Sequence, residues 1–272
     1  MKETLTRLLS GVVYVILLIA ATTYSFNTFL LLFGLFMIVC VIEFCSLVGL
    51  HKAIPLIIAC SGFILFAYFP APKSNTSFVT TENLLLLATL LISAKCLQFL
   101  FSSTQRTDTI SKFVYLIGYV ILPFILITKL PLGKIGYNPK IVISIFILIW
   151  TNDTFAYIVG KRIGKRKLFE RISPKKTVEG FIGGLVFGIV AGVLIAEYYI
   201  GESVAKWTVI ALIAGVFGTL GDLVESKFKR FADVKDSGRI MPGHGGILDR
   251  LDSVIFAVPF IFLFYQIIYY VS

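Results

Sequence analysis

The stretch VEGFIGGLVFGIVAGVLIAEYYI, residues 178–200, decides the fold class of this chain. It is apolar along almost its whole length and, as a helix, is long enough to cross a bilayer core of about 30 Å. Glycines recur in it at every fourth position: Gly180, Gly184, Gly188 and Gly192. Residues four apart share one helix face, and their missing side chains let another helix approach closely. The stretch therefore predicts a membrane-spanning helix that packs tightly against a neighbour.

The rest of the chain repeats this hydrophobic pattern. Of its 272 residues, 57% are hydrophobic, and the mean hydropathy is +0.92, which excludes a soluble domain. Windows of about 17 to 25 apolar residues predict nine spans, near residues 8–24, 28–48, 54–69, 84–101, 112–128, 140–159, 178–200, 206–222 and 254–271. Because the third and fifth are short, eight spans is the alternative. The predicted fold class is all-α, a polytopic integral membrane protein with about nine transmembrane helices.

The distribution of charge predicts how the chain is threaded. With the N-terminus inside, 19 of the 25 Lys and Arg residues fall on the cytoplasmic side and 5 on the other side, as the positive-inside rule requires. The two longest polar loops, 160–177 and 223–253, then face the cytoplasm together, and the C-terminus lies outside. No Ser- or Gly-rich linker interrupts the chain, so we expect one integral membrane domain over 1–272, with N-terminal helices in 1–140 and catalytic helices and loops in 141–272.

Two pairs of carboxylates stand at predicted helix ends beside these loops. Asp222 and Glu225 end the eighth span, three residues apart, so they share a helix face. Asp249 and Asp252 repeat that spacing where the ninth span begins. Ionised carboxylates at a membrane boundary are costly unless they meet a cation or a basic group, and Mg²⁺ prefers such oxygen ligands. Salt bridges to neighbouring Lys and Arg residues explain the spacing equally well.

Two further polar stretches interrupt or precede spans. Asn152 and Asp153 lie inside the sixth span. An acid within a membrane span is by default a candidate functional residue, and the alternative is that the two residues form a structural hydrogen-bonded pair between helices. In SPKKT, residues 173–177, the spacing predicts Ser173 as a helix N-cap with proline at the first helical position. The helix N-terminus, together with Lys175 and Lys176, would then form a phosphate-binding site.

The stretch KDSGRIMPGHGGILDRLDS, residues 235–253, precedes the last span. Gly243, Gly245 and Gly246 allow backbone amides to approach a phosphate. His244, as a lone histidine, is expected to be a hydrogen-bonding or structural group rather than a general base. A Walker-type nucleotide loop is absent from the sequence.

The stretch SKFKRFADVKDSGRIMPGHGGILDRLD, residues 226–252, resembles the signature of CDP-diacylglycerol synthases, also called phosphatidate cytidylyltransferases. The positions that match in order and spacing are Ser226, Lys229, Arg230, Lys235, Asp236, Pro242, His244, Gly245, Gly246, Asp249, Arg250 and Asp252. The stretches SPKKTVEG and NDTFAYIVGKRIGK also resemble family motifs, whereas the first 140 residues match only as a pattern of spans. Met241 and Val178 depart from the residues most expected at their positions.

The resemblance implies an enzyme of the cytoplasmic membrane that joins CTP and phosphatidate into CDP-diacylglycerol and pyrophosphate, with Mg²⁺ and an option for a second cation. The expected partners are the two substrates and the lipid bilayer, not nucleic acid, and the glycine face is compatible with a homodimer. The resemblance also implies that Asp222, Asp249, Asp252 and Glu225 bind the metal and that Lys175 and Lys176 are catalytic phosphate-binding residues. The residues that it implies for substrate binding are Ser173, Thr177, Lys229, Arg230, Lys235, His244, Gly245, Gly246, Arg250, Asn152 and Asp153.

Two other functions fit the same residues. A CTP-dependent polyprenol or lipid kinase would transfer a γ-phosphoryl group to an alcohol, so cytidine would not enter the lipid. A cation-coupled transporter would use the intramembrane acids to bind its ion and would not depend on CTP.

Overall fold

The computed structural model describes residues 2–68, 81–102, 107–133 and 136–271. Its helices, including three π-helical turns, are α1 (Lys2–Tyr24), α2 (Phe26–Val48), α3 (Ala53–Phe63), η1 (Ile64–Tyr68), α4 (Thr81–Phe101), α5 (Thr109–Tyr115), η2 (Leu116–Ile121), α6 (Leu122–Ile127), α7 (Pro139–Ile163), α8 (Val178–Leu194), η3 (Ile195–Ile200), α9 (Val204–Phe231) and α10 (Leu248–Val271). Two antiparallel hairpins pair β1 (Leu132–Gly133) with β2 (Gly136–Tyr137), and β3 (Lys167–Phe169) with β4 (Ser173–Thr177).

All nine predicted spans correspond to helical segments, which confirms the all-α membrane fold. Within the described residues, eight segments are long and apolar enough to cross a membrane, and the third, Ala53–Tyr68, is shorter. The last residue predicted for that span, Phe69, lies outside the described residues. Large apolar side chains such as Leu8, Val13 and Ile16 of α1 remain 60–62% exposed on the outer surface. An apolar surface of this extent is typical of contact with lipid.

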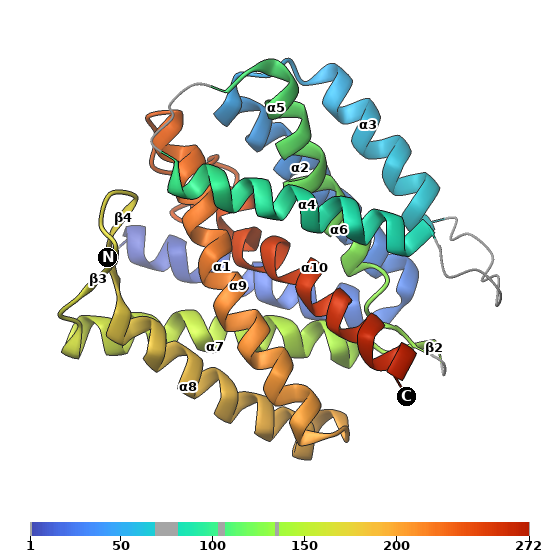
Figure 1. The fold of residues 1–272 in the computed structure, drawn as a ribbon, viewed down its shortest axis with the longest axis vertical. Coiled ribbons are helices and arrows are strands. Elements are labelled where there is room, and N and C mark those ends of the chain that lie inside the picture. The colour runs from blue at the N-terminus through green and yellow to red at the C-terminus, as the bar shows by residue number, and fades with distance from the viewer. Residues whose placement is uncertain (1, 69–80, 103–106, 134–135, 272) are drawn as a thin grey trace.

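The polar loops gather at one end of the helical bundle. Figure 1 shows the N-terminus beside the β3–β4 hairpin, while the C-terminus lies near β2 on the opposite side. Arg171 of the β3–β4 loop and Lys227 of α9 donate hydrogen bonds to the same backbone oxygen, that of Ser102, at 2.9 and 3.0 Å. Segments 69 and 125 residues apart in sequence thus meet at this end. Three residues of the charge count, Lys73, Arg106 and Lys134, lie outside the described residues.

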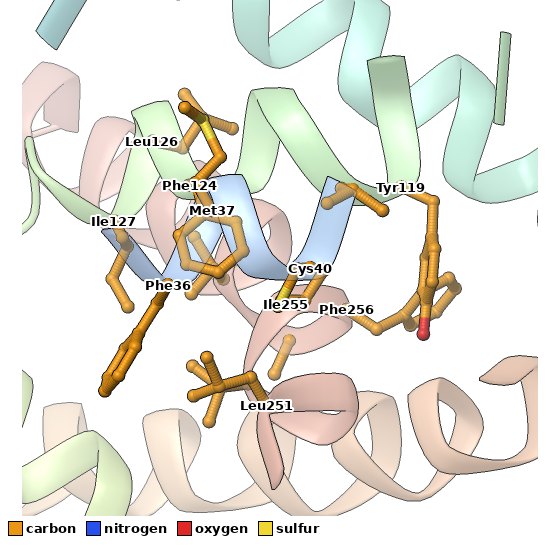
Figure 2. Packing of buried hydrophobic residues seen from close by; sticks show 14 of the residues in the cluster. Phe36, Met37, Cys40, Tyr119, Phe124, Leu126, Ile127, Leu251, Ile255 and Phe256 are labelled. Atoms are coloured by element: carbon orange, nitrogen blue, oxygen red, sulfur yellow. The ribbon is translucent and has the colours of Figure 1, made fainter. Parts of the chain in front are cut away.

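The start of α10 is held in the centre of the protein. Figure 2 shows Leu251, Ile255 and Phe256 of α10 packed near Cys40 of α2 and Tyr119 of η2. All five side chains are at most 3% exposed. Because lipid tails are as apolar as these side chains, close packing holds the helices together mainly through van der Waals contact. The core therefore fixes the position of the first turns of α10, which carry three of the predicted site residues.

The glycine face of α8 packs inside the chain, as its spacing predicts. The buried residues of α8 are the four glycines of the repeat, Gly180, Gly184, Gly188 and Gly192. The first three face α7 around Ala156 and Asn152, and the last faces the backbone of Trp207 in α9. This face is therefore used within one chain and gives no support to the expected homodimer.

Gly184→Ala is expected to destabilise the protein, whereas Gly188→Ala, one turn along the same helix, is expected to be tolerated. A Cβ at position 184 would lie 2.7 Å from the backbone oxygen of Asn152, but at position 188 the nearest atom is the Cβ of Asn152 at 4.0 Å. Overlap in a packed interior costs typically about 1–3 kcal/mol. Thermal unfolding of both variants in one detergent measures the difference, and equal midpoints would contradict this packing.

Candidate active site

Three carboxylates meet where α9 and α10 pack together. One oxygen each of Asp222, Glu225 and Asp252 lie within 4.8 Å of one another. Glu225 is fully buried and Asp252 is 8% exposed, while the side chain of Asp222 is 34% exposed. This acidic cluster is therefore enclosed at Glu225 and accessible at Asp222.

The acidic cluster has the donor chemistry of a site for a hard divalent cation. The Oε1 atom of Glu225 is buried and has no hydrogen-bond partner among the described residues. A buried charged oxygen without a partner is costly, and a cation shared by the three carboxylates would supply that partner. Carboxylate oxygens are the ligands that Mg²⁺ prefers, so the residues fit the predicted metal.

Two glycines of α9 allow the two helices to meet. A Cβ on Gly221 would lie 2.6 Å from the backbone oxygen of Asp252, and a Cβ on Gly218 would lie 3.5 Å from the Cβ of Ser253. Because the backbones approach this closely, Asp222 comes next to Asp252. This pair was not among the residues predicted from the sequence, although two glycines three residues apart on one helix face indicate close packing.

Lys229 supplies positive charge beside the acidic cluster. Its Nζ atom lies 2.5 Å from Oε2 of Glu225 and 2.7 Å from Oδ1 of Asp249, and the side chain is only 12% exposed. Lys229, predicted to bind substrate, is thus engaged by two carboxylates of the protein.

Asp249 does not join the acidic cluster. While Oδ1 pairs with Lys229, Oδ2 accepts hydrogen bonds from the backbone nitrogens of Ser237 at 2.8 Å and Gly246 at 2.7 Å, and from the Ser237 hydroxyl at 2.9 Å. Both oxygens are therefore used within the protein. Three of the four predicted metal ligands therefore converge, while Asp249 connects Lys229 to the preceding loop. This geometry does not favour Asp249 as a metal ligand.

The β3–β4 hairpin brings a lysine to the acidic cluster. The Nζ atom of Lys176 lies 2.6 Å from Oδ2 of Asp222, whereas the neighbouring Lys175 is exposed. On β4, side chains alternate in direction, so the two lysines predicted to bind phosphate are separated. Lys176 contacts the cluster, and Lys175 faces the surroundings at the same end of the protein.

The predicted N-cap at Ser173 is wrong. Residues 173–177 form strand β4, and α8 begins only at Val178, with Thr177 as its N-cap. The Thr177 side chain accepts a hydrogen bond from the backbone nitrogen of Gly180 at 3.1 Å. Pairing with β3, in which Lys167 lies opposite Thr177, occupies this segment before the helix can start. Local cap preference yields here to a pairing that the sequence pattern did not reveal.

Asn152 lies on the side of α7 that meets α8 and α9, and the neighbouring Asp153 is exposed. Asn152 is 2% exposed, and a Cβ on Gly184 or Gly215 would lie within 2.9 Å of its side-chain oxygen. Its amide donates to Oδ1 of Asp153 at 3.3 Å, and Asp153 is within electrostatic range of Lys176 and Asp222. The part of these two side chains in shaping a polar region at the site stays a prediction.

The glycine-rich stretch forms a closed turn. Met241 donates its backbone N–H to the oxygen of Gly245, and His244 donates to the oxygen of Met241, both at 2.9 Å. Gly243 and Gly245 have φ of 74° and 85°, values that L side chains rarely adopt. The amide of Gly246 already donates to Asp249. The expected approach of Gly246 to a phosphate is therefore not supported, and these glycines shape the turn itself.

His244 ties this turn to the first helix. Its Nδ1 atom lies 2.8 Å from the hydroxyl of Ser10 in α1, and the same hydroxyl donates to the backbone oxygen of Pro242 at 3.0 Å. Burial, together with the nearby charges of Arg250 and Arg7, lowers the pKa of His244 below its ordinary value. A neutral histidine held in this way agrees with the structural role expected from the sequence.

The remaining predicted substrate-binding residues stand at the exposed rim. Arg230, Lys235 and Arg250 are exposed. Arg230 donates to the backbone oxygen of Val234 at 3.2 Å, and Arg250 donates to that of His244 at 3.1 Å. These cations and the two lysines at the cluster make the same end of the protein attractive to polyanions.

Two polar residues around the start of α10 were not predicted from the sequence. Glu43 of α2 is 4% exposed and accepts hydrogen bonds at the start of α10. Ser237 bonds to both Glu43 and Asp249. The signal for Glu43 was present, because it is an acid inside the apolar span 28–48, where such a residue is a functional candidate by default.

Several curated relatives carry the name phosphatidate cytidylyltransferase. A Bacillus subtilis protein is 54% identical over 119 residues, covering 43% of this chain and 44% of the relative. Proteins of Staphylococcus saprophyticus and Staphylococcus aureus are each 53% identical over 116 residues, covering 42% of this chain and 44% of the relative. The match thus spans less than half the length of these relatives.

The family model described as the cytidylyltransferase family matches residues 5–268, nearly the whole chain. The match includes the acidic cluster on α9 and α10, the β3–β4 hairpin and also the N-terminal helices, for which the sequence analysis found only a pattern of spans. It confirms the resemblance at the level of the family, and this chain belongs to the cytidylyltransferase family.

Proposed function

We propose that this protein is a phosphatidate cytidylyltransferase, which forms CDP-diacylglycerol and pyrophosphate from CTP and phosphatidate. The observation that carries the proposal is the acidic cluster of Asp222, Glu225 and Asp252 with Lys176 bound to its open side. The cluster lies on apolar helices next to exposed basic residues. Relatives that bear the same name support the choice of substrates.

The reaction is a nucleotidyl transfer that needs no protein nucleophile. An oxygen of the phosphatidate phosphate attacks the α-phosphorus of CTP, the bond from that phosphorus to the oxygen bridging to the β-phosphate breaks, and pyrophosphate leaves with the electron pair. Because both reactants are anions, the protein contributes mainly position and charge. Lys176 neutralises phosphate charge at the open side, and Lys235 and Arg250 attract CTP from water.

Asp222, Glu225 and Asp252 would hold Mg²⁺, which supplies charge neutralisation at the phosphates and orients them. Four acidic side chains surround two lysines in this region: Asp222, Glu225, Asp249 and Asp252 around Lys176 and Lys229. The excess negative charge favours a divalent cation. A second cation remains part of the proposal without a separate ligand set.

The proposed location is the cell membrane, with the site facing the cytoplasm, the N-terminus inside and the C-terminus outside. Support comes from the excess of basic residues in the loops at the site end and from the termini on opposite sides of the bundle (Figure 1). Phosphatidate keeps its acyl chains in the bilayer while CTP arrives from water, so the reacting phosphates must meet at this boundary.

Labelled CTP tests the proposed activity. The purified protein in detergent receives phosphatidate, Mg²⁺ and CTP labelled either on cytosine or on the γ-phosphate. We expect the cytosine label in the lipid and the γ label in pyrophosphate. The γ label in a lipid would instead indicate the kinase. If neither label moves with folded, lipid-supplied protein, the enzyme proposal fails, and cation flux across vesicles becomes the activity to measure.

A further inference from the structure

We propose that Glu43 of α2 is a positioning residue for the transfer reaction, because its carboxylate fixes the start of α10 and, through Ser237 and Asp249, the placement of Lys229. The proposal rests on the proposed function for the reaction that Glu43 serves. It assigns to the N-terminal half of the chain a part in organising the site.

Glu43 acts as the cap of α10. Its Oε1 atom accepts a hydrogen bond from the backbone nitrogen of Ile247 at 3.1 Å, and Oε2 accepts one from that of Leu248 at 2.8 Å. The first N–H groups of a helix lack partners within the helix, and a negative charge is favoured there. An acid from a helix about 200 positions earlier in the sequence therefore provides what a local cap residue usually provides.

The surroundings leave Glu43 little freedom. It is 4% exposed, and a Cβ on either Gly238 or Gly246 would overlap its carboxylate. These two glycines thus give the carboxylate room between the loop and the helix. A side chain confined in this way transmits its position to the groups that it binds.

A continuous series of polar contacts connects Glu43 to the acidic cluster. The Ser237 hydroxyl lies 3.3 Å from Oε2 of Glu43 and 2.9 Å from Oδ2 of Asp249. Oδ1 of Asp249 lies 2.7 Å from Nζ of Lys229, which in turn lies 2.5 Å from Oε2 of Glu225. The same first turns of α10 carry Asp252. Movement of this helix start therefore changes both the cluster and its counter-charge.

Glu43→Gln tests the inference with the size of the side chain kept. The two carboxylate oxygens each accept from one backbone N–H group, those of Ile247 and Leu248, so replacing one oxygen by an NH₂ group deprives one of these donors of its acceptor. Loss of one charged hydrogen bond corresponds to a roughly tenfold effect. We expect kcat to fall about tenfold and the Mg²⁺ concentration for half-maximal activity to rise. The affinity for Mn²⁺, measured by electron paramagnetic resonance without substrates, should fall by a similar factor. Glu43→Asp, which keeps the charge, should restore part of each loss relative to Glu43→Ala.

Cys45→Ala is the matched control. Cys45 lies two residues after Glu43 on α2, about 200° around the helix, and is fully buried in the hydrophobic core. We expect it to lower the unfolding temperature and to leave the metal dependence unchanged. If Glu43→Gln behaves like Cys45→Ala, with a lower unfolding temperature but unchanged kcat and metal affinity, Glu43 is merely structural and the inference is overturned.

The Mn²⁺ measurement separates this inference from the proposed function. If the wild-type protein transfers no cytidylyl group but binds Mn²⁺, the proposed function fails, and the comparison of Mn²⁺ affinities still decides the role of Glu43. If the wild type is active and Glu43→Gln changes neither kcat nor metal affinity, only the inference fails. A wild type that neither binds Mn²⁺ nor turns over would overturn both.

Discussion

Asp252→Asn is expected to lower cytidylyl transfer by roughly a thousandfold or more, because a metal that stabilises transferring phosphates contributes several kcal/mol and each 1.36 kcal/mol is a factor of ten. Asp252 is 8% exposed and shares the acidic cluster with Asp222 and Glu225. Removing one of three adjacent negative charges also relieves repulsion. The variant should therefore unfold at an equal or higher temperature without metal, and lose the stabilisation that Mg²⁺ gives the wild type.

Asp233→Asn is the control for this change. Asp233 lies just beyond α9, is exposed, and has a φ of 54°, which asparagine tolerates well. Turnover and the thermal shift caused by Mg²⁺ are measured for both variants in the same detergent. Wild-type turnover with a wild-type Mg²⁺ response in Asp252→Asn would exclude Asp252 as an essential ligand.

Lys229→Met is expected to destabilise the protein by about 3–5 kcal/mol, the usual result of removing one partner from a buried ion pair. The lysine lies between Glu225 and Asp249, whose side chains are 0% and 5% exposed. Without it, both carboxylates remain buried without their counter-charge. Chemical unfolding in mixed micelles, with the free energy extrapolated to zero denaturant, measures the loss.

A second change separates the loss of charge from the loss of packing. Glu225→Gln combined with Lys229→Met removes one of the stranded charges, so the double variant should be more stable than Lys229→Met alone. Arg230→Met, at the next position and exposed, should change stability by less than about 0.5 kcal/mol. If Lys229→Met costs no more than Arg230→Met, the buried ion pair does not hold the end of α9 in place.

The sequence determined the helical framework because its signals are local. A run of apolar residues is long enough to span a bilayer whatever it later contacts, so all nine segments could be located. The glycine repeat of α8 likewise required only helix periodicity to predict a buried face. The pair Asp222 and Glu225 was found for the same reason, since three-residue spacing on a helix fixes a common face before any folding is known.

Only the tertiary structure decided which polar group meets which. Asp249 and Asp252 have the same spacing as the other pair, yet one binds Lys229 and two backbone amides while the other joins the acidic cluster. Ser173 has the local features of a cap, but its segment pairs with β3. Glu43 caps a helix about 200 positions away. Hydrogen bonds and ion pairs act over a few ångströms, so their partners depend on how the helices pack, which the spacing of residues along one helix does not specify.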